Sequence, residues 1–193
     1  MKKILLLIFL CTNVFLHAQN LKITYNYNDY NADLNIYNSL SEFTSNSINK
    51  TIVYSDLNIK KHYLLFNGLP IKELNAPCLI DISSPYNWKI TNETKNILGY
   101  KCTKAVTTIT RTNVSYSVTA WFSNQLKYQI GPKGTFGLPG LILEIQSENS
   151  ELNCIASSIV INKNIKQIKI PKYKILSLQN FNDILKKKTG VIY

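Results

Sequence analysis

The sequence predicts a single-domain, mainly β protein built on an antiparallel sheet, with one short helix near its C-terminal end. Three observations support this fold class. Apolar and polar residues alternate with the two-residue period of half-buried strands along much of the chain. Polar turn segments separate these short runs. Only one segment spaces its apolar residues as a helix does.

Several strands are expected in the N-terminal half. The clearest is Leu21 to Tyr27, in which every second residue is apolar or aromatic. Residues 28–49 are rich in Asn, Ser and Asp, so we expect a long connection with weak strand character around Leu34 to Tyr37. Further strands are expected at Thr51 to Tyr54, His62 to Phe66 and Cys78 to Ile82, with a turn at Asn67-Gly68.

The middle of the chain predicts a hairpin. Tyr100 to Ile109 and Val114 to Phe122 are both strand-like, and residues 110–113 form a polar turn between them. In the second strand the apolar residues share one face and Trp121 lies on the other, as is typical of an antiparallel sheet with one buried face. Strands at Leu141 to Ile145 and Leu152 to Ile161 follow.

The helix is expected from Ser177 to Lys186. Ser177 can act as its N-cap, because a serine hydroxyl accepts a hydrogen bond from a free N–H of the first turn. The apolar residues Leu178, Phe181, Ile184 and Leu185 share one face, and lysines near the C-terminal end suit the helix dipole.

The first 18 of the 193 residues predict a secretory signal peptide. Two lysines precede the apolar run from Ile4 to Leu10, and the small residue Ala18 suits a cleavage site. That run is too short for a membrane span, which needs about 20 apolar residues. We therefore expect an exported protein of the periplasm or cell envelope, with residues 19–193 forming one domain.

Positive charge is concentrated at the C-terminal end. The chain has 22 basic and 11 acidic residues, and the segment from residue 161 to the end holds eight lysines and one acidic residue. The region Lys163–Lys188 can contact an anionic membrane surface or an outer-membrane or surface protein. The alternative is a solvated face that keeps an edge strand from pairing. Nucleic acid is not an expected partner of an exported protein.

Three cysteines follow the predicted cleavage site, namely Cys78, Cys102 and Cys154. An exported protein can form disulfides, and we favour a bond between Cys102 and Cys154 because both lie in alternating strands. The alternative is three buried thiols that never meet.

The sequence shows no catalytic set, metal site or cofactor motif. His62 is the only histidine after residue 18 and lies within an apolar strand, where a structural role is more common than catalysis. Cys, His and carboxylate residues do not cluster at metal-ligand spacing. The two tryptophans, Trp88 and Trp121, are candidates to line a site for an apolar or sugar ligand, the alternative being core packing.

A glycine-rich segment, Gly131 to Gly140, holds four of the seven glycines. Pro139-Gly140 fits the central positions of a type II turn, where glycine supplies the positive φ. The segment is not a phosphate-binding loop, because Gly-Lys-Ser/Thr and a following helix are both missing.

The hexapeptide that ends this segment carries a family resemblance. Its residues are Gly137, Leu138, Pro139, Gly140, Leu141 and Ile142. With residues 87–90, 97–105, 120–122 and 131–132 it resembles the pattern of the GLPGLI family of Bacteroidetes envelope proteins. The match extends from about Trp88 to Ile145. The resemblance implies an exported protein without an established activity and a curved antiparallel sheet similar to the half-barrel of lipoprotein carriers.

Three hypotheses of function follow. The first is an envelope protein without enzymatic activity that binds an apolar or amphipathic small ligand on a curved sheet. The second is an interaction module of an outer-membrane or surface complex. The third is a hydrolase or peptidase with an unrecognised site around His62. The sequence leaves enzymatic activity open and favours its absence, since no catalytic set is evident.

Overall fold

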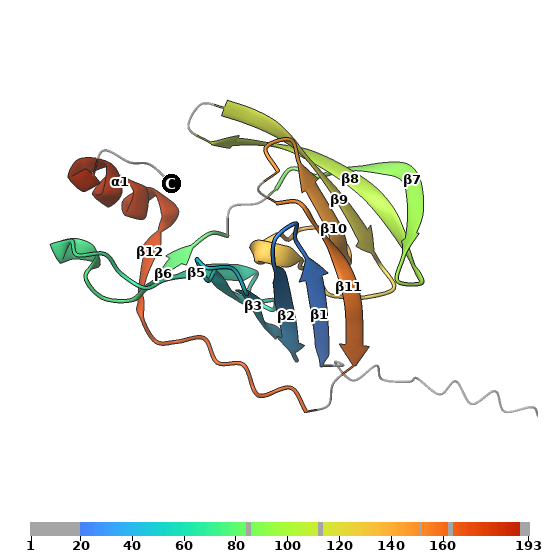
Figure 1. Ribbon diagram of the computed structural model, residues 1–193, viewed down its shortest axis with the longest axis horizontal. Helices are drawn as coiled ribbons and strands as arrows, with labels where there is room; N and C mark the ends of the chain where they lie inside the picture. The colour runs from blue at the N-terminus through green and yellow to red at the C-terminus, as the bar shows by residue number, and fades with distance from the viewer. Residues whose placement is uncertain (1–19, 84–85, 112–113, 151, 162–163, 190–193) are drawn as a thin grey trace, which may run out of the picture.

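The computed structural model describes residues 20–83, 86–111, 114–150, 152–161 and 164–189, and one sheet of twelve strands organises this described part of the chain. The strand order is β12-β6-β5-β4-β3-β2-β1-β11-β10-β9-β8-β7. All neighbours pair antiparallel except β12 and β6, which pair in parallel. The sheet is strongly curled but not closed, and its two ends face each other (Figure 1). The mainly β fold with a curved sheet and one short C-terminal helix is confirmed.

The strands are β1 (Leu21–Asn26), β2 (Asn31–Tyr37), β3 (Leu40–Ser45), β4 (Ile52–Asp56), β5 (Lys61–Phe66), β6 (Cys78–Asp81), β7 (Lys89–Ile97), β8 (Tyr100–Arg111), β9 (Val114–Ser123), β10 (Leu141–Ser147), β11 (Cys154–Ile161) and β12 (Lys174–Ser177). Two short 3-10 helices, η1 (Lys72–Leu74) and η2 (Pro132–Gly134), lie in connections, and α1 (Leu178–Thr189) follows β12. None of the helices among the described residues is long and apolar enough to span a membrane.

The strand character expected around Leu34 to Tyr37 is confirmed as part of β2, but the long connection expected at residues 28–49 is wrong, because the segment also contains β3. Ala32, Leu34 and Ile36 alternate with polar residues along β2 and are fully buried. In β3 the buried face carries two serines beside Phe43, so the apolar signal is weak there. Strands β7 and β12 were also missed, since both lie at edges of the sheet and are mostly exposed.

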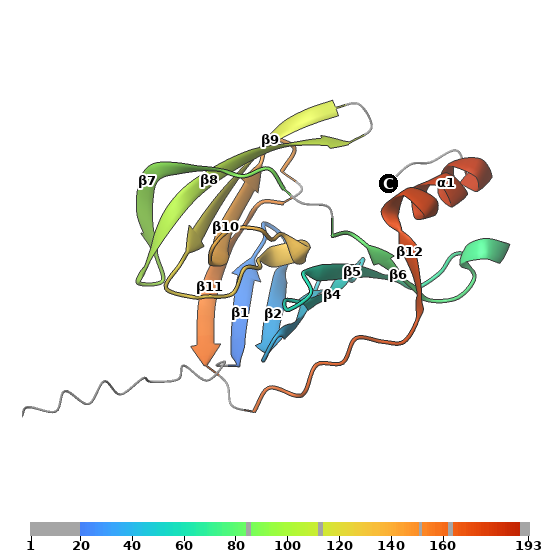
Figure 2. The same ribbon diagram turned by 180° about the vertical axis from the view of Figure 1, so that it is seen from behind.

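The inner face of the curl forms the main core. Leu21, Ile23 and Tyr25 of β1 point inward with at most 2% of their surface exposed. On the opposite wall Val118, Ala120 and the other alternate residues of β9 are buried in the same cluster. Figure 2 shows these walls from behind, with the connection from β9 to β10 running inside the curve. Burial of apolar surface from both walls stabilises the curvature.

The connection from β9 to β10 fills the space between the walls. Its helix η2 packs against β3 and β4, and a side chain at Gly134 would collide with Val53 of β4. The phenol of Tyr25 donates a 2.7 Å hydrogen bond to the carbonyl oxygen of Ile142, at the start of β10 directly after this connection. The concave face is therefore occupied by the chain's own glycine-rich segment.

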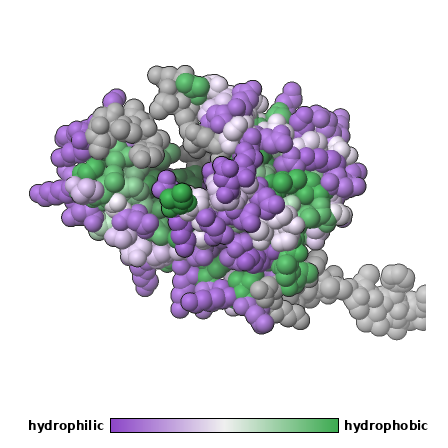
Figure 3. Space-filling view, in the orientation of Figure 1, coloured by the Kyte–Doolittle hydropathy of each residue, from purple (hydrophilic) through white to green (hydrophobic). Residues whose placement is uncertain are grey.

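The C-terminal segment covers both faces of the other end of the sheet. Residues 164–173, which we call the strap, cross the outer face, where Ile168 packs with Tyr54 and Leu79. Helix α1 lies on the opposite face, where Phe181 and Leu185 pack against β6. The predicted cap is present, because the Ser177 hydroxyl accepts a hydrogen bond from the N–H of Asn180. The face drawn in Figure 3 is mostly hydrophilic and is hollowed between the end with α1 and the end with β7–β9.

Candidate functional site

Trp88 anchors the glycine-rich segment to the wall of the curl. Its indole N–H donates a 2.8 Å hydrogen bond to the carbonyl oxygen of Phe136. The indole ring also stacks with Tyr86 and lies next to Gly137. Because the polar edge of Trp88 is used inside the protein, these contacts give it a structural role. Ligand binding by Trp88 stays a prediction.

The prediction of a type II turn at Pro139-Gly140 is wrong. The positive φ of the hexapeptide is at Gly137, at 94°, and not at Gly140. The N–H of Gly140 donates to the carbonyl oxygen of Leu138, so Pro139 is the centre of a three-residue turn. Gly140 is required for a different reason, because a Cβ there would lie 2.2 Å from the carbonyl oxygen of Ser123.

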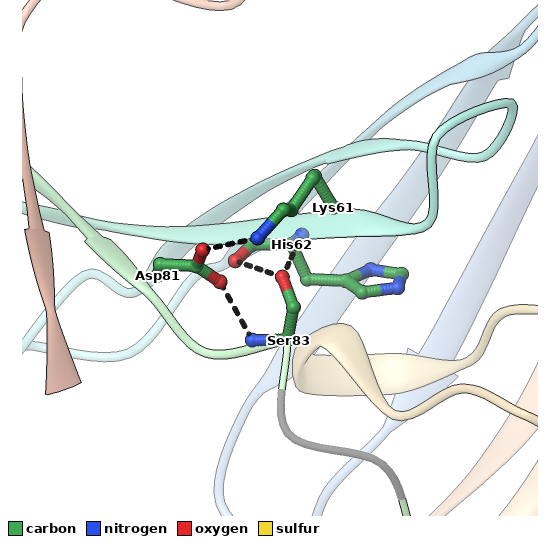
Figure 4. Close-up of polar contacts among 4 residues, drawn as sticks. All are labelled: Lys61, His62, Asp81 and Ser83. Carbon is green, nitrogen blue, oxygen red and sulfur yellow. Dashed lines mark hydrogen bonds and ion pairs between the residues drawn. The ribbon is translucent and has the colours of Figure 1, made fainter.

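His62 is a buried structural residue. Its ring stacks on Phe136 at 3.9 Å, and Nδ1 shares a 2.9 Å hydrogen bond with the hydroxyl of Ser55. Burial lowers the pKa of His62 to about 4, which keeps the imidazole neutral. The ring points away from the Asp81 carboxylate, which pairs instead with Lys61 (Figure 4).

Trp121 lies on the outer face, where a lysine side chain covers its ring. Lys95 of β7 reaches across the indole ring, with its ammonium 4.4 Å from the ring centroid, and pairs with Glu144 of β10 at 2.6 Å. The side chain of Glu144 is only 6% exposed, and the amide of Gln146 donates to its other oxygen. Lys95 therefore covers one face of the indole. Ligand binding by Trp121 stays a prediction.

The predicted disulfide between Cys102 and Cys154 is not formed, and all three described cysteines are free thiols. The register explains this. Cys102 lies on the face of β8 that carries Lys104, and this face continues through Trp121 to Glu144. Cys154 pairs with Ile145 and so points to the opposite, inner face. A single sheet separates the two thiols, and burial raises the pKa of Cys154 to about 12.

The lysine-rich region is only partly engaged. Lys188 of α1 forms a 3.2 Å ion pair with Glu73 of η1, and Lys163 lies outside the described residues. Lys166, Lys169 and Lys172 are exposed on the strap. Contact of this region with an anionic surface or a surface protein stays a prediction.

Two polar pockets lie at the surface. One, of about 800 Å³, lies between the strap and the outer face of β2 and β3, and is lined by Asn35, Glu42 and residues 164–169. The other, of about 630 Å³, lies beside the turns that follow β2 and β4. We call this second one the turn pocket, and it is lined by Asn38, Ser39, Leu57, Asn58, Lys60, Lys127, Tyr128 and Gln129. Within the described part of the chain, no group of three His, Cys, Asp or Glu side chains could hold a metal ion.

The turn pocket is assembled from three distant segments. The turn before β3 supplies Asn38 and Ser39, the turn before β5 supplies three residues from Leu57 to Lys60, and residues 127–129 come from the segment after β9. The N–H of Leu57 donates to the carbonyl oxygen of Ser39, which ties the first two turns together. Sequence reasoning missed this pocket, since the residues meet only when the sheet curls. The one available signal was the abundance of Asn in turn segments.

The fold and pockets define a class of protein, an open curled β-sheet domain with polar surface pockets. Residues 82–186 match the family described as N-glycanase peptide, N-terminal domain, and the chain belongs to this family. Two solved structures of PNGF-II, in the P21 and C2 space groups, have similar folds. Their TM-scores are 0.62 and 0.61 at 18% and 19% sequence identity, over 88% and 89% of this chain.

This likeness to solved structures shows the fold alone, given the low identity. The chain covers 34% of the length of each PNGF-II chain, which is about a third. A comparison with curated proteins found no match.

The resemblance to the GLPGLI family is thus corrected. The region that carried the resemblance lies wholly within the segment that matches the N-glycanase N-terminal domain, and the fold is similar to that of part of PNGF-II. In the structure, Gly137 to Ile142 are a turn and the start of β10, in which Gly137 and Pro139 are exposed and the other four residues are buried. The predicted signal peptide lies outside the described residues, so export and envelope location stay predictions.

Proposed function

We propose that this chain is a carbohydrate-binding domain that serves glycan processing and holds a glycan in the turn pocket. The observation that carries the proposal is the lining of that pocket. It combines three side-chain amides, a hydroxyl and a tyrosine in a volume of about 630 Å³. Membership of the N-glycanase N-terminal domain family supports a glycan as the ligand class.

The chemistry of this lining matches that of a sugar. The amides of Asn38, Asn58 and Gln129 each offer both donors and an acceptor, as vicinal sugar hydroxyls require. Tyr128 and Leu57 supply apolar surface for the C–H face of a sugar ring. Pockets for small ligands commonly measure about 300–1,000 Å³, so this one suits a short oligosaccharide.

The walls of the turn pocket are held in place by backbone hydrogen bonds. In addition to the hydrogen bond that joins the two turns, the N–H of Leu141 donates to the carbonyl oxygen of Leu126, and the N–H of Ile142 donates to the carbonyl oxygen of Ile130. These two bonds fix both ends of the segment that carries residues 127–129 to β10. Such preorganisation lowers the entropy lost on binding.

The other hypotheses have less support. An apolar or amphipathic ligand would need the concave face, which the glycine-rich segment fills. A hydrolase built on His62 would need an accessible imidazole, and His62 is 2% exposed. The chain spans about a third of the PNGF-II structures, and the proposal concerns glycan binding by this domain alone. The role as a partner of a surface complex remains a second proposal for the lysine-rich region.

The test is isothermal titration calorimetry of the purified protein with N,N′-diacetylchitobiose and with a high-mannose N-glycan. We expect saturable binding that the double variant Asn58→Ala/Gln129→Ala weakens by at least 10-fold. The matched control is Asn92→Ala, an exposed amide on the edge strand β7, which should bind as the wild type does. Binding that the pocket variant leaves unchanged would disprove this site.

A further inference from the structure

The turn pocket has an uneven charge. Among the described residues that line it there are two lysines, Lys60 and Lys127, and no carboxylate. The pocket under the strap differs, since Glu42 lies among its lysines. A neutral sugar does not need two ammonium groups, so their presence requires a separate explanation.

Neither lysine pairs with a carboxylate among the residues that the structure describes. Within the described residues, the ion pairs join other lysines, and neither Lys60 nor Lys127 takes part in one. The acidic residue nearest to Lys60 in the chain is Asp56. Its carboxylate accepts hydrogen bonds from the N–H groups of Asn58 and Ile59 and so stabilises the turn that follows β4.

The backbone fixes where Lys60 leaves the turn. Lys60 has a left-handed φ of 53°, and Asn38 on the facing turn has a φ of 54°. Lys127 lies directly after Leu126, whose carbonyl oxygen accepts hydrogen bonds from the N–H groups of Tyr128 and Leu141. Both lysines therefore extend from constrained backbone beside the same cavity.

We propose that the turn pocket recognises an anionic sugar residue, one that bears a carboxylate or a sulfate, through Lys60 and Lys127. This inference rests on the proposed function and names the ligand class of the same site. The two ammonium groups bind the anion, and the amides of Asn38, Asn58 and Gln129 bind the neighbouring hydroxyls. An anion placed there forms charge-assisted hydrogen bonds, which are stronger than neutral ones. It also relieves the repulsion between two like charges at one cavity.

The test compares three probes that share one disaccharide, namely lactose, 3′-sialyllactose and lactose 3′-sulfate. We expect both anionic probes to bind the purified protein about 10-fold more tightly than lactose at low salt. The advantage should shrink in 1 M NaCl, where screening acts within about 3 Å. Lys60→Gln and Lys127→Gln should each weaken binding of the anionic probes by about 5- to 10-fold and weaken lactose binding by a clearly smaller factor. The matched control is Lys101→Gln, an exposed lysine of β8.

Each outcome separates the two proposals. Tighter binding of only one anionic probe supports the inference and identifies the anion. Equal binding of lactose and both anionic probes overturns the inference and leaves glycan binding intact. If none of the three sugars nor the N-glycans binds a protein that melts cooperatively, both proposals fail.

Discussion

Replacing Gly140 with alanine tests whether the glycine-rich segment is part of the core. A Cβ at this position would lie 2.2 Å from the carbonyl oxygen of Ser123, 2.5 Å from its carbonyl carbon and 2.8 Å from the N atom of Asn124. These are backbone atoms at the end of β9, so no side-chain rotation can relieve the overlap. Relief requires β9 and β10 to separate where Ser123 pairs with Leu141. Overpacking typically costs about 1–3 kcal/mol, and we expect about 3 kcal/mol here.

The assay is thermal and urea unfolding of the purified variant. For a domain of this size, about 3 kcal/mol corresponds to a decrease in Tm of roughly 6–12 °C. The control is Gly99→Asn, because Gly99 has a φ of 82°, which asparagine tolerates, and no neighbouring atom within 4 Å. That control should change stability by less than about 1 kcal/mol. A Gly140→Ala variant as stable as the control would refute the close approach of the two strands.

Three further predictions concern stability. Leu98 is exposed and has a left-handed φ of 50° in the turn between β7 and β8. Because asparagine adopts this conformation more readily than leucine, Leu98→Asn should raise the free energy of unfolding in urea by about 0.5–1 kcal/mol. A destabilised variant would contradict the turn geometry. Burial lowers the pKa of His62 to about 4, so unfolding releases an imidazole that binds a proton more readily. Stability should therefore decrease as pH falls from about 6.5 towards 4, by at most about 1.4 kcal/mol per pH unit, and less steeply in His62→Gln. Identical pH profiles would count against the buried neutral imidazole. Lys95→Ala leaves the Glu144 carboxylate, which is 6% exposed, without its cation and should lower the free energy of unfolding by about 1–3 kcal/mol. Lys104→Ala removes the partner of an exposed carboxylate and should lower it by less than about 1 kcal/mol. Equal effects of these two lysine variants would refute the distinction between them.

The parts of the fold predicted from sequence are those with strong local signals. The hairpin of β8 and β9 was predicted within one or two residues because a polar turn separates two alternating strands. The helix and its Ser177 cap were predicted because capping is local. Strand β3 was missed because its buried face carries Ser41 and Ser45, and its burial depends on the rest of the curl.

The candidate site was less predictable than the fold. Residues of the turn pocket are separated by up to about ninety positions in the chain, and no local pattern links Asn38 to Gln129. The disulfide was predicted wrongly because alternation places a residue on a face but does not say which face two distant strands share. The role of Gly140 could not be predicted either, since the collision that excludes a side chain involves the backbone of another strand.

The central claim is that this curled-sheet domain binds carbohydrate in the turn pocket. The most direct measurement is a titration of the ¹⁵N-labelled protein with N,N′-diacetylchitobiose, followed by amide chemical shifts. The account predicts saturable shifts at residues 38–39, 57–60 and 127–129, with little change around Trp121. Saturable shifts confined to the surface around Trp121, or none at any sugar concentration up to tens of millimolar, would contradict it.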